Sequence, residues 1–382
     1  MNFNRVLLLI SIVLKFTISY AQYDSIPYGG YDRTYNLHLP IGYTGSTSIP
    51  LIIALHGGGH SAIEIESMSG LSLKADLENF IVVYPEGVKG LLSNARTWNA
   101  GECCGYASFS NIDDVGFIDA LIIILASQYN IDPNRIYATG VSNGGFFAYR
   151  LACELSNKIA SIAPVASSMT LDSCTPDRPV SIIHFHSVND TRVPYQGGVG
   201  SGLATHYNPP IDSIINIWSN INICLNVDDT IINNGLYTFR KWSNCECGNE
   251  IIYYLTQDGG HSWPGGIKTT LGDSVSNYIN ATDLMWDFFQ QHTLCPPLSI
   301  ENETIGNNRV EVYPNPTNRK LKFYTKIAYQ DISISVFTIT GQKILITNGK
   351  SEIDISHLTI GTYFVLINID GSIKVEKIIK IE

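Results

Sequence analysis

Residues 135–151 read Arg-Ile-Tyr-Ala-Thr-Gly-Val-Ser-Asn-Gly-Gly-Phe-Phe-Ala-Tyr-Arg-Leu, a strand-like run, a glycine-rich turn and a helix-like run. Residues 140–144 fit the pattern G-x-S-x-G. In this pattern small residues let a strained turn close and hold the serine hydroxyl above a sheet edge. The pattern alone is a weak signal, because a plain glycine-rich turn also matches it. Its position between a strand and a helix predicts that Ser142 is a nucleophile.

A serine nucleophile needs a base to take its proton and an acid to orient the base. On such a turn the three residues follow in the order Ser, Asp, His. His261 lies in a glycine-rich loop after the strand-like residues 251–255 and is the predicted base, with a solvent-facing turn histidine as the alternative. Asp190 follows the strand-like residues 180–186 and is the predicted acid, with a turn-capping aspartate as the alternative. Asp113 and Asp114 precede Ser142, so we interpret them as helix-start charges.

The loop His56-Gly57-Gly58-Gly59-His60 follows the strand-like residues 51–55. Glycines there let backbone amides approach a carbonyl oxygen. We expect an oxyanion hole made by the N–H groups of Asn143 and Gly58, with Gly57 and Gly59 as alternatives to Gly58. Three aromatic residues are candidates for stacking on a substrate, with ordinary packing as an equal alternative: Trp263, Trp98 and Tyr195.

Strand-like and helix-like segments alternate from Arg33 to about Gln291. Seven strand-like runs are residues 35–39, 51–55, 80–84, 136–139, 159–165, 180–186 and 251–255. Helix-like stretches are residues 112–129, 143–155, 211–220 and 280–291. This alternation predicts an α/β fold, a mostly parallel sheet covered by helices on both faces, with the site at the carboxyl ends of the strands.

The pattern of polar and apolar residues changes after Cys295-Pro296-Pro297. Residues 298–308 are polar and aperiodic, which is typical of a linker. From Val310 on, short β-rich runs are separated by turn residues, and Gly341-Gln342 and Asp370-Gly371 indicate hairpins. No helix-period segment intervenes, so we expect a small all-β sandwich at the C-terminus.

The chain has 382 residues, of which 45% are apolar and 15% charged, enough apolar content for a large core. Its formal net charge of −10 comprises 14 Lys+Arg against 27 Asp+Glu before residue 305, and 10 against 7 from there on. An acidic body without a basic stripe argues against nucleic acid as a partner.

The N-terminus has the features of a secretory signal. Arg5 precedes an apolar run over residues 6–13, and Ser19-Tyr20-Ala21 places small residues before a cleavage point at Gln22. A retained membrane anchor is the alternative, but Lys15 keeps the uninterrupted run well below about 18 apolar residues. No later segment is apolar enough to span a bilayer, so we expect no transmembrane span in the mature form.

Eight cysteines in an exported chain favour disulfides over a zinc site, which needs Cys-x-x-Cys pairs that are absent. The sequence leaves their connectivity open, and we put forward the pairs Cys153–Cys174 and Cys224–Cys247. The sequence offers one candidate metal cluster, which consists of His184 and His186 with His56 or His60. No carboxylate is placed beside them, so we expect no metal.

Several motifs together resemble the polyhydroxybutyrate depolymerase and feruloyl esterase family. They are His56-Gly57-Gly58-Gly59, Cys103-Cys104-Gly105, Asp113-Asp114-Val115-Gly116-Phe117, residues 138–145, Tyr149-Arg150-Leu151-Ala152-Cys153-Glu154, Val193-Pro194-Tyr195 and residues 259–265. The resemblance covers about residues 30–292. It implies an α/β-hydrolase fold, a Ser142–His261–Asp190 triad, no metal or organic cofactor, and hydrolysis of esters in a polyester or of acyl groups on a plant polysaccharide. In this family glycine usually follows the histidine that precedes the loop of the acid, whereas this chain has Ser187 after His186.

A second resemblance covers the tail. Val312-Tyr313-Pro314-Asn315-Pro316-Thr317, residues 334–341, Ile355-Ser356-His357-Leu358, Gly361-Thr362-Tyr363-Phe364-Val365 and Lys377-Ile378-Ile379-Lys380 look like the C-terminal sorting domain of the type IX secretion system. This implies a Gram-negative host of the Bacteroidetes type and export through the periplasm to the surface or medium. The type IX machinery is then the expected partner. A carbohydrate-binding sandwich is the alternative.

We therefore expect a signal peptide (1–21), an esterase domain (22–297), a linker (298–308) and a sorting domain (309–382). The expected activity is that of a secreted serine carboxylic ester hydrolase. Alternatives are an acetylxylan esterase or serine peptidase of the same fold, and a non-catalytic surface binding protein.

Overall fold

The structure is a computed structural model that describes residues 22–90, 94–202, 206–270, 272–295, 311–324, 332–338, 343–369 and 372–382. The chain divides into two compact units, Met1–Cys295 and Pro296–Glu382, which are described separately. The expected signal peptide, the expected linker and the two expected hairpin turns at 341–342 and 370–371 fall outside the described residues, wholly or in part. Across the described ranges, no helix is long and apolar enough to cross a bilayer.

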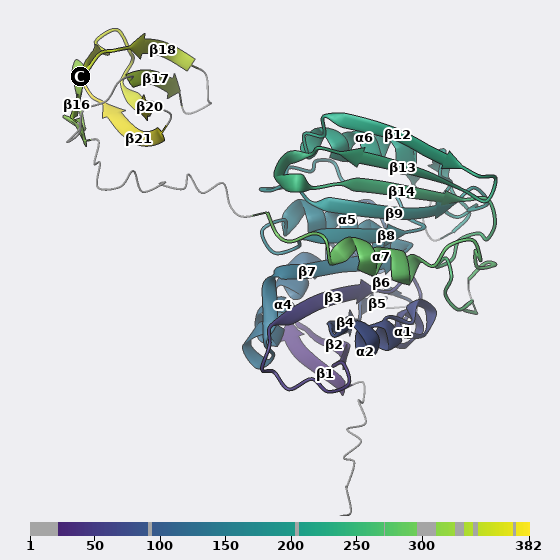
Figure 1. The fold of residues 1–382 in the computed structure, drawn as a ribbon. Coiled ribbons are helices and arrows are strands. Elements are labelled where there is room, and N and C mark those ends of the chain that lie inside the picture. The colour runs from purple at the N-terminus through teal and green to yellow at the C-terminus, as the bar shows by residue number, and fades with distance from the viewer. Residues whose placement is uncertain are drawn as a thin grey trace, which may run out of the picture. The chain divides into compact units, whose positions relative to one another are not determined.

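The first unit is built on a ten-stranded sheet with the strand order β1-β2-β4-β3-β7-β8-β9-β14-β13-β12 (Figure 1). In that order the strands are Gln22–Tyr28, Tyr31–His38, Ile81–Pro85, Ile49–Leu55, Ile131–Val141, Ser161–Val165, Ser181–Ser187, Ile251–Thr256, Tyr237–Ser243 and Asn226–Asn233. The run from β4 to β14 is parallel, and antiparallel strands flank it at both edges. The predicted mostly parallel sheet is confirmed.

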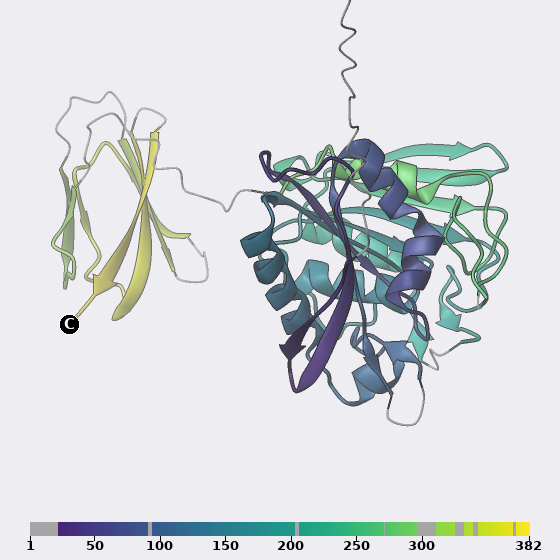
Figure 2. The same ribbon diagram turned by 90° about the horizontal axis from the view of Figure 1, so that it is seen from below.

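Helices cover both faces of this sheet, as Figure 2 shows. They are α1 (Ala62–Ser69), α2 (Leu71–Glu78), α3 (Gly105–Phe109), α4 (Asp114–Gln128), α5 (Asn143–Glu154), α6 (Ile211–Ile221), α7 (Ala281–Phe289) and the 3-10 turn η1 (Glu246–Gly248). One hydrophobic core holds apolar side chains of α4, α5 and α6, and the other holds those of α1, α2 and α7. Two short ribbons complete the unit, β5 (Val88–Lys89) with β6 (Arg96–Thr97) and β10 (Gly198–Val199) with β11 (Tyr207–Asn208).

The central strands β3 and β4 are apolar along their whole length because helices cover both faces of the sheet. Every residue of β3 and of β9 is buried. The edge strands β1, β12 and β13, and the helices α1 and α2, were not predicted from the sequence. Their patterns are weak: Leu73 and Leu77 on α2 are exposed, and β13 is only half-buried.

The second unit consists of two antiparallel sheets, β15-β16-β19 and β18-β17-β20-β21. The strands are β15 (Glu311–Tyr313), β16 (Lys320–Tyr324), β17 (Ile332–Thr338), β18 (Lys343–Asn348), β19 (Glu352–Asp354), β20 (Gly361–Ile369) and β21 (Ser372–Lys380). Leu321 and Phe323 of the first sheet share one core with Ile334, Val365 and Ile367 of the second. The predicted small all-β sandwich is confirmed.

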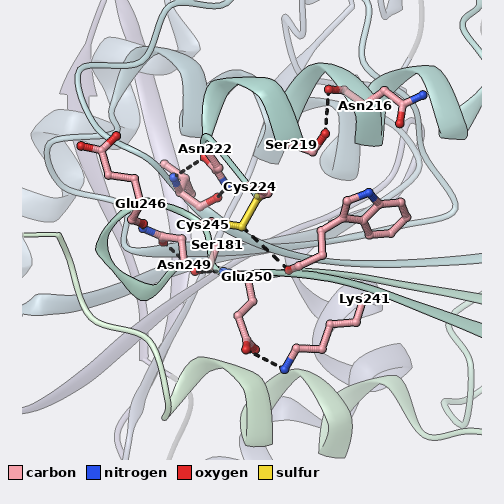
Figure 3. Close-up of a disulfide and its surroundings, with 12 residues drawn as sticks. Ser181, Asn216, Ser219, Asn222, Cys224, Lys241, Cys245, Glu246, Asn249 and Glu250 are labelled. Atoms are coloured by element: carbon pink, nitrogen blue, oxygen red, sulfur yellow. Dashed lines mark hydrogen bonds and ion pairs between the residues drawn. A yellow bond between two sulfur atoms is a disulfide. The ribbon is translucent and has the colours of Figure 1, made fainter. Parts of the chain in front are cut away.

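Four disulfides pair the eight cysteines: Cys103–Cys104, Cys153–Cys174, Cys224–Cys245 and Cys247–Cys295. The Cys153–Cys174 pairing is confirmed, and the Cys224–Cys247 pairing is wrong. Cys224 meets Cys245 because residues 222–224 after α6 lie against the loop that follows β13, where Glu246 N–H donates to Asn222 O at 2.9 Å (Figure 3). Cys247 is left to hold the end of the unit at Cys295.

We expect the Cys153–Cys174 disulfide to stabilise the first unit mainly by restricting the unfolded chain. It closes a loop with a sequence separation of 21, for which the loss is about 3 kcal/mol. The double variant Cys153→Ser, Cys174→Ser should lower the free energy of unfolding by this amount in denaturant titrations without reductant. The Cys103→Ser, Cys104→Ser variant is the control, because adjacent cysteines close no loop. Equal losses in the two variants would contradict this entropic account.

Candidate active site

Ser142 occupies a strained turn between β7 and α5. Its backbone has φ 55° and ψ −126°, a conformation that residues with a side chain rarely adopt. Such a residue costs on the order of 1–3 kcal/mol and persists only where its surroundings hold it. Here Ser142 N–H donates to Val165 O at 2.9 Å, and Ser142 O accepts from Gly145 and Phe146 at the start of α5.

Two glycines allow this turn to form. A Cβ at Gly140 would lie 2.6 Å from Gly144 O and 2.8 Å from Leu55 O. A Cβ at Gly144 would collide with the backbone oxygens of Leu55 and His56. The small residues of the sequence pattern are therefore required, because the end of β3 packs directly against the turn.

Asp190 and His261 form a buried hydrogen-bonded pair. His261 Nδ1 lies 2.8 Å from Asp190 Oδ2, and both side chains are nearly inaccessible to solvent. A carboxylate can only accept, so His261 Nδ1–H donates and Nε2 is left as the basic nitrogen. Asp190 lies in the loop after β9, and His261 in the loop after β14, at the carboxyl ends of two neighbouring parallel strands.

Asp190 is held ionised by its neighbours. Burial opposes ionisation, but the charge and hydrogen bond of His261 outweigh it, aided by His186 and by Val193 N–H, so the pKa of Asp190 lies below its usual value. The second carboxylate oxygen accepts from the N–H groups of Arg192 and Val193, each at 2.9 Å. The turn-capping role weighed as an alternative for Asp190 is thus also present, and one side chain performs both.

Ser142 and His261 line the same two cavities. Within the described residues, the Ser142 hydroxyl makes no hydrogen bond to His261 or to another side chain. In enzymes without substrate such hydrogen bonds are often long and shorten only on binding. The structure therefore brings Asp190 and His261 into contact and places Ser142 beside them on a shared cavity wall.

The two carboxylates that precede Ser142 in the chain, Asp113 and Asp114, form their contacts away from Ser142 and His261. Asp114 is fully buried, pairs with Arg33 at 2.6 Å and accepts from Asn99 N–H at 2.8 Å. Asp113 caps α4 by accepting from Gly116 N–H at 2.9 Å. The helix-start interpretation holds for Asp113. Asp114 in addition carries a buried ion pair that anchors the segment before Cys103.

The expected oxyanion donors lie at the cavities. Gly58 lines both cavities and Asn143 lines the larger one, in each case with Ser142. The amide of Gly59 donates to Arg96 O at 2.8 Å, which removes Gly59 as an alternative donor. The Gly58 amide has no partner within the part of the chain that the structure describes.

The Asn143 side chain fixes the neighbouring loop. Trp98 N–H donates to Asn143 Oδ1 at 2.7 Å, and Asn143 Nδ2 donates back to Trp98 O at 3.0 Å. Both groups are buried. Asn143 therefore ties the segment around Trp98 to the first turn of α5.

Burial favours the packing alternative for the two tryptophans, and stacking on a substrate stays a prediction. Trp98 and Trp263 are both 0% exposed. Trp98 stacks on Phe147 and donates to His56 O, and Trp263 donates to Thr282 Oγ1 within the core. Only Trp263 contributes to a cavity wall, and Tyr195 lines neither cavity. Tryptophan beside a catalytic motif is a signal for packing as much as for binding.

The imidazole of His56 is neutral and holds the glycine loop, residues 56–60, through two hydrogen bonds. Gly87 N–H donates to His56 Nε2 at 3.0 Å, so the ring proton is on Nδ1, which donates to Gly57 O at 2.8 Å. Burial lowers the pKa of His56 to about 3. Both ring nitrogens are used in holding the loop, so His56 is structural.

Asp273 was missed by the sequence analysis. Its Oδ2 accepts from His261 N–H at 2.9 Å, its Oδ1 lies 3.4 Å from Arg192, and all three residues line both cavities. A Cβ at Gly260 would lie 2.8 Å from Asp273 Cβ. The Gly259-Gly260 pair was the available signal, because it indicates close approach of another segment. No motif identifies which segment that is.

The two cavities differ in size. The smaller has a volume of about 30 Å³, room for about one water, and includes Met68, Val141 and Trp263 in its wall. The larger has a volume of about 850 Å³ and includes Cys104, Phe146 and Val193. Ser142 lies where the walls of the two meet.

Among the residues that the structure describes, no group of three or more His, Cys, Asp or Glu side chains is arranged to hold a metal ion. The candidate pair His184 and His186 is hydrogen-bonded to each other instead, at 3.0 Å.

Two families match parts of the chain. Residues 33–173 match the family described as Esterase PHB depolymerase, and residues 311–382 match the Secretion system C-terminal sorting domain. Both resemblances expected from the sequence are confirmed. One solved structure, an acetyl xylan esterase from Aspergillus awamori, superposes with a TM-score of 0.50 at 13% identity, covering 71% of this chain and 99% of that one. The expected α/β-hydrolase fold is confirmed.

Curated relatives are esterases of low identity. The chain is 27% identical over 274 residues to the bifunctional acetylxylan esterase/xylanase XynS20E of Neocallimastix patriciarum, covering 70% of this chain and 34% of that protein. It is 29% identical over 267 residues to feruloyl esterase B of Piromyces equi, covering 67% and 44%. It is 29% identical over 279 residues to the putative esterase NocK of Nocardia uniformis subsp. tsuyamanensis, covering 68% and 79%. The chain thus spans less than half of the first two relatives.

We expect His56 to make stability depend on pH. The unfolded chain takes up a proton at His56 below about pH 6.5, whereas the native state resists protonation down to about pH 3. Protonation therefore favours unfolding, and stability falls as the pH falls, by up to about 1.4 kcal/mol per pH unit. The His56→Gln variant should show a smaller slope of unfolding free energy between about pH 6 and pH 4. Equal slopes in the two proteins would rule this out.

We expect Asn143→Ala to loosen the turn. It removes two hydrogen bonds to the Trp98 backbone and leaves buried partners unpaired, for a loss of about 1–3 kcal/mol per unpaired group. Denaturant unfolding measures this loss. The exposed Asn157→Ala is the control and should change stability by no more than about 0.5 kcal/mol. A similar small effect in both variants would show that the Asn143 side chain does not hold the loop.

Proposed function

We propose that this chain, with its Esterase PHB depolymerase match and its sorting-domain match, is an exported serine hydrolase of carboxylic esters. Ser142 is the nucleophile, His261 the general base and Asp190 the residue that orients it. The observation that carries the proposal is the buried His261–Asp190 pair, 2.8 Å apart, whose His261 lines the same cavity as Ser142.

The proposed reaction begins with His261 Nε2. It takes the Ser142 proton while Oγ bonds to the carbonyl carbon, and the electron pair of the C=O bond moves to oxygen. The N–H groups of Asn143 and Gly58 stabilise this oxyanion. When the carbonyl re-forms, the bond to the alcohol breaks and His261 protonates the leaving oxygen. Water, deprotonated by His261, then attacks the acyl carbon, and Ser142 leaves and recovers its proton.

Acyl esters of plant cell-wall polysaccharides and ester polymers are the proposed substrates. The support is the family match together with the printed names of the relatives, which include a feruloyl esterase and an acetylxylan esterase. A cavity of about 850 Å³ beside Ser142 can accept an aromatic acyl group or a sugar chain. The substrate contacts expected of Tyr195 stay a prediction, because Tyr195 is half-buried and lies outside the two cavity walls.

Acetyl esters are the second candidate class. The cavity of about 30 Å³ beside Ser142 has room for a methyl-sized group and no more. An ester with an acetyl group in this cavity and a polysaccharide in the larger one fits both volumes. No comparable observation favours the hypothesis that the protein is a serine peptidase.

We further propose the route of export. Residues 1–21 are a cleaved signal peptide, residues 22–297 the esterase domain, residues 298–308 a linker and residues 309–382 the sorting domain. The match of residues 311–382 supports delivery by the type IX secretion machinery, which is the proposed protein partner, to the cell surface or the medium of a Gram-negative bacterium.

Ser142→Ala should abolish hydrolysis of a chromogenic short-chain ester, because no other described residue replaces the nucleophile. The expected loss is on the order of 10⁴-fold or more in kcat, with far-ultraviolet circular dichroism unchanged. Wild-type protein should be labelled stoichiometrically by an organophosphonate and Ser142→Ala should not. An active Ser142→Ala variant, or wild-type protein that neither hydrolyses esters nor reacts, would favour a binding protein that has kept the fold.

A further inference from the structure

A line of buried polar side chains connects α5 to the loop that carries Asp190. Tyr149 Oη lies 2.9 Å from His184 Nδ1, and His184 Nε2 lies 3.0 Å from His186 Nδ1. His186 Nε2 lies 2.7 Å from the backbone oxygen of Val193. All three side chains are at most 2% exposed. Tyr149 is on α5, the helix that begins at the Ser142 turn, and the histidines are on β9.

The direction of every hydrogen bond in this line follows from its last acceptor. A backbone carbonyl can only accept, so His186 Nε2 carries a proton. A neutral His186 then has an unprotonated Nδ1, which accepts from His184 Nε2–H. By the same reasoning His184 Nδ1 accepts from the Tyr149 hydroxyl. Three donors in sequence therefore point from α5 towards Val193.

The histidines of this line are neutral. Burial lowers the pKa of His184 well below its ordinary value, and it lowers the pKa of His186 against the opposing effects of Asp190 and Val193 O. A proton added to His186 Nδ1 would face the N–H of His184. Asp190 and His261 are the titratable groups that act on His186 from outside the line, and Tyr253 packs edge-on against His184.

The end of the line holds the Asp190 loop from two sides. His186 Nε2–H binds Val193 O, while Val193 N–H donates to Asp190 Oδ1 at 2.9 Å. His186 Nε2 also lies 3.4 Å from Asp190 Oδ2, the oxygen that accepts from His261. The hydrogen bonds that run from Tyr149 to Val193 therefore fix the position of the Asp190 carboxylate relative to α5.

We propose that Tyr149, His184 and His186 are positioning residues that keep the Asp190 carboxylate at a fixed position relative to Ser142. This inference rests on the proposed ester hydrolysis, because it assigns the line a part in that reaction. None of the three side chains lines either cavity beside Ser142, so each acts through Asp190. Displacement of a catalytic group by about 1 Å can lower the rate by about 100-fold.

Replacement of His186 tests the proposal. His186→Leu should lower kcat by about 10-fold to 100-fold, with KM changed less than about threefold, because His186 contacts Asp190 and the Val193 backbone and does not itself line either cavity. His186→Gln, which keeps a donor within reach of Val193 O, should recover most of the kcat.

His292→Leu is the matched control. His292 is buried to a similar extent and donates from Nδ1 to Phe288 O at 2.8 Å, but its partners are Phe288 and Glu250 and not the loop that carries Asp190. It should lose stability while kcat stays as in wild type, with active protein counted by organophosphonate labelling. If His186→Leu does not fold, His186→Asn against His186→Gln gives the same comparison, because the shorter amide cannot reach Val193 O.

The outcomes separate the two proposals. Inactive wild-type protein would overturn ester hydrolysis itself. Active wild-type protein, with His186→Leu or His186→Asn behaving like His292→Leu in kcat, would overturn the positioning role alone.

Discussion

The conformation of Ser142 is the constraint on which the site depends. A positive φ at a residue with a side chain is unfavourable, and it persists because the surrounding segments leave the turn no alternative. Gly140 and Gly144 allow the end of β3 to lie against the turn, and α5 starts immediately after Ser142. The Ser142 hydroxyl, the first amide of α5 and the glycine loop after β3 are therefore set in place by one packing arrangement.

Buried polar groups with fixed hydrogen-bond directions surround this turn. His56 uses both ring nitrogens on backbone groups, Asn143 pairs with both polar groups of the Trp98 backbone, and Asp190 accepts from His261 and two amides. Inside a protein an unpaired polar group is costly, and a fully paired one is rigid. The neutral state of His56 and the ionised state of Asp190 both follow from these partners. Rigid neighbours of this kind are what a reaction centre needs, since its groups must not reorganise during the reaction.

The second unit has its own core and its own chemistry. Its two sheets enclose apolar side chains of β16, β17, β20 and β21, and its net charge is opposite in sign to that of the first unit. It also has its own family match, to the Secretion system C-terminal sorting domain, separate from the esterase match of residues 33–173.

The sequence by itself determined the strand–turn–helix around Ser142, the order of Ser142, Asp190 and His261, and the all-β tail, because each has a local signal: a glycine pattern, a period or a turn residue. It did not determine which cysteine Cys224 meets, whether Trp98 and Trp263 face substrate, or that Asp273 contacts His261. It also could not show that Tyr149, His184 and His186 form one line. These depend on which segments distant in the chain become neighbours, and only the packed sheet with its two helical layers decides that.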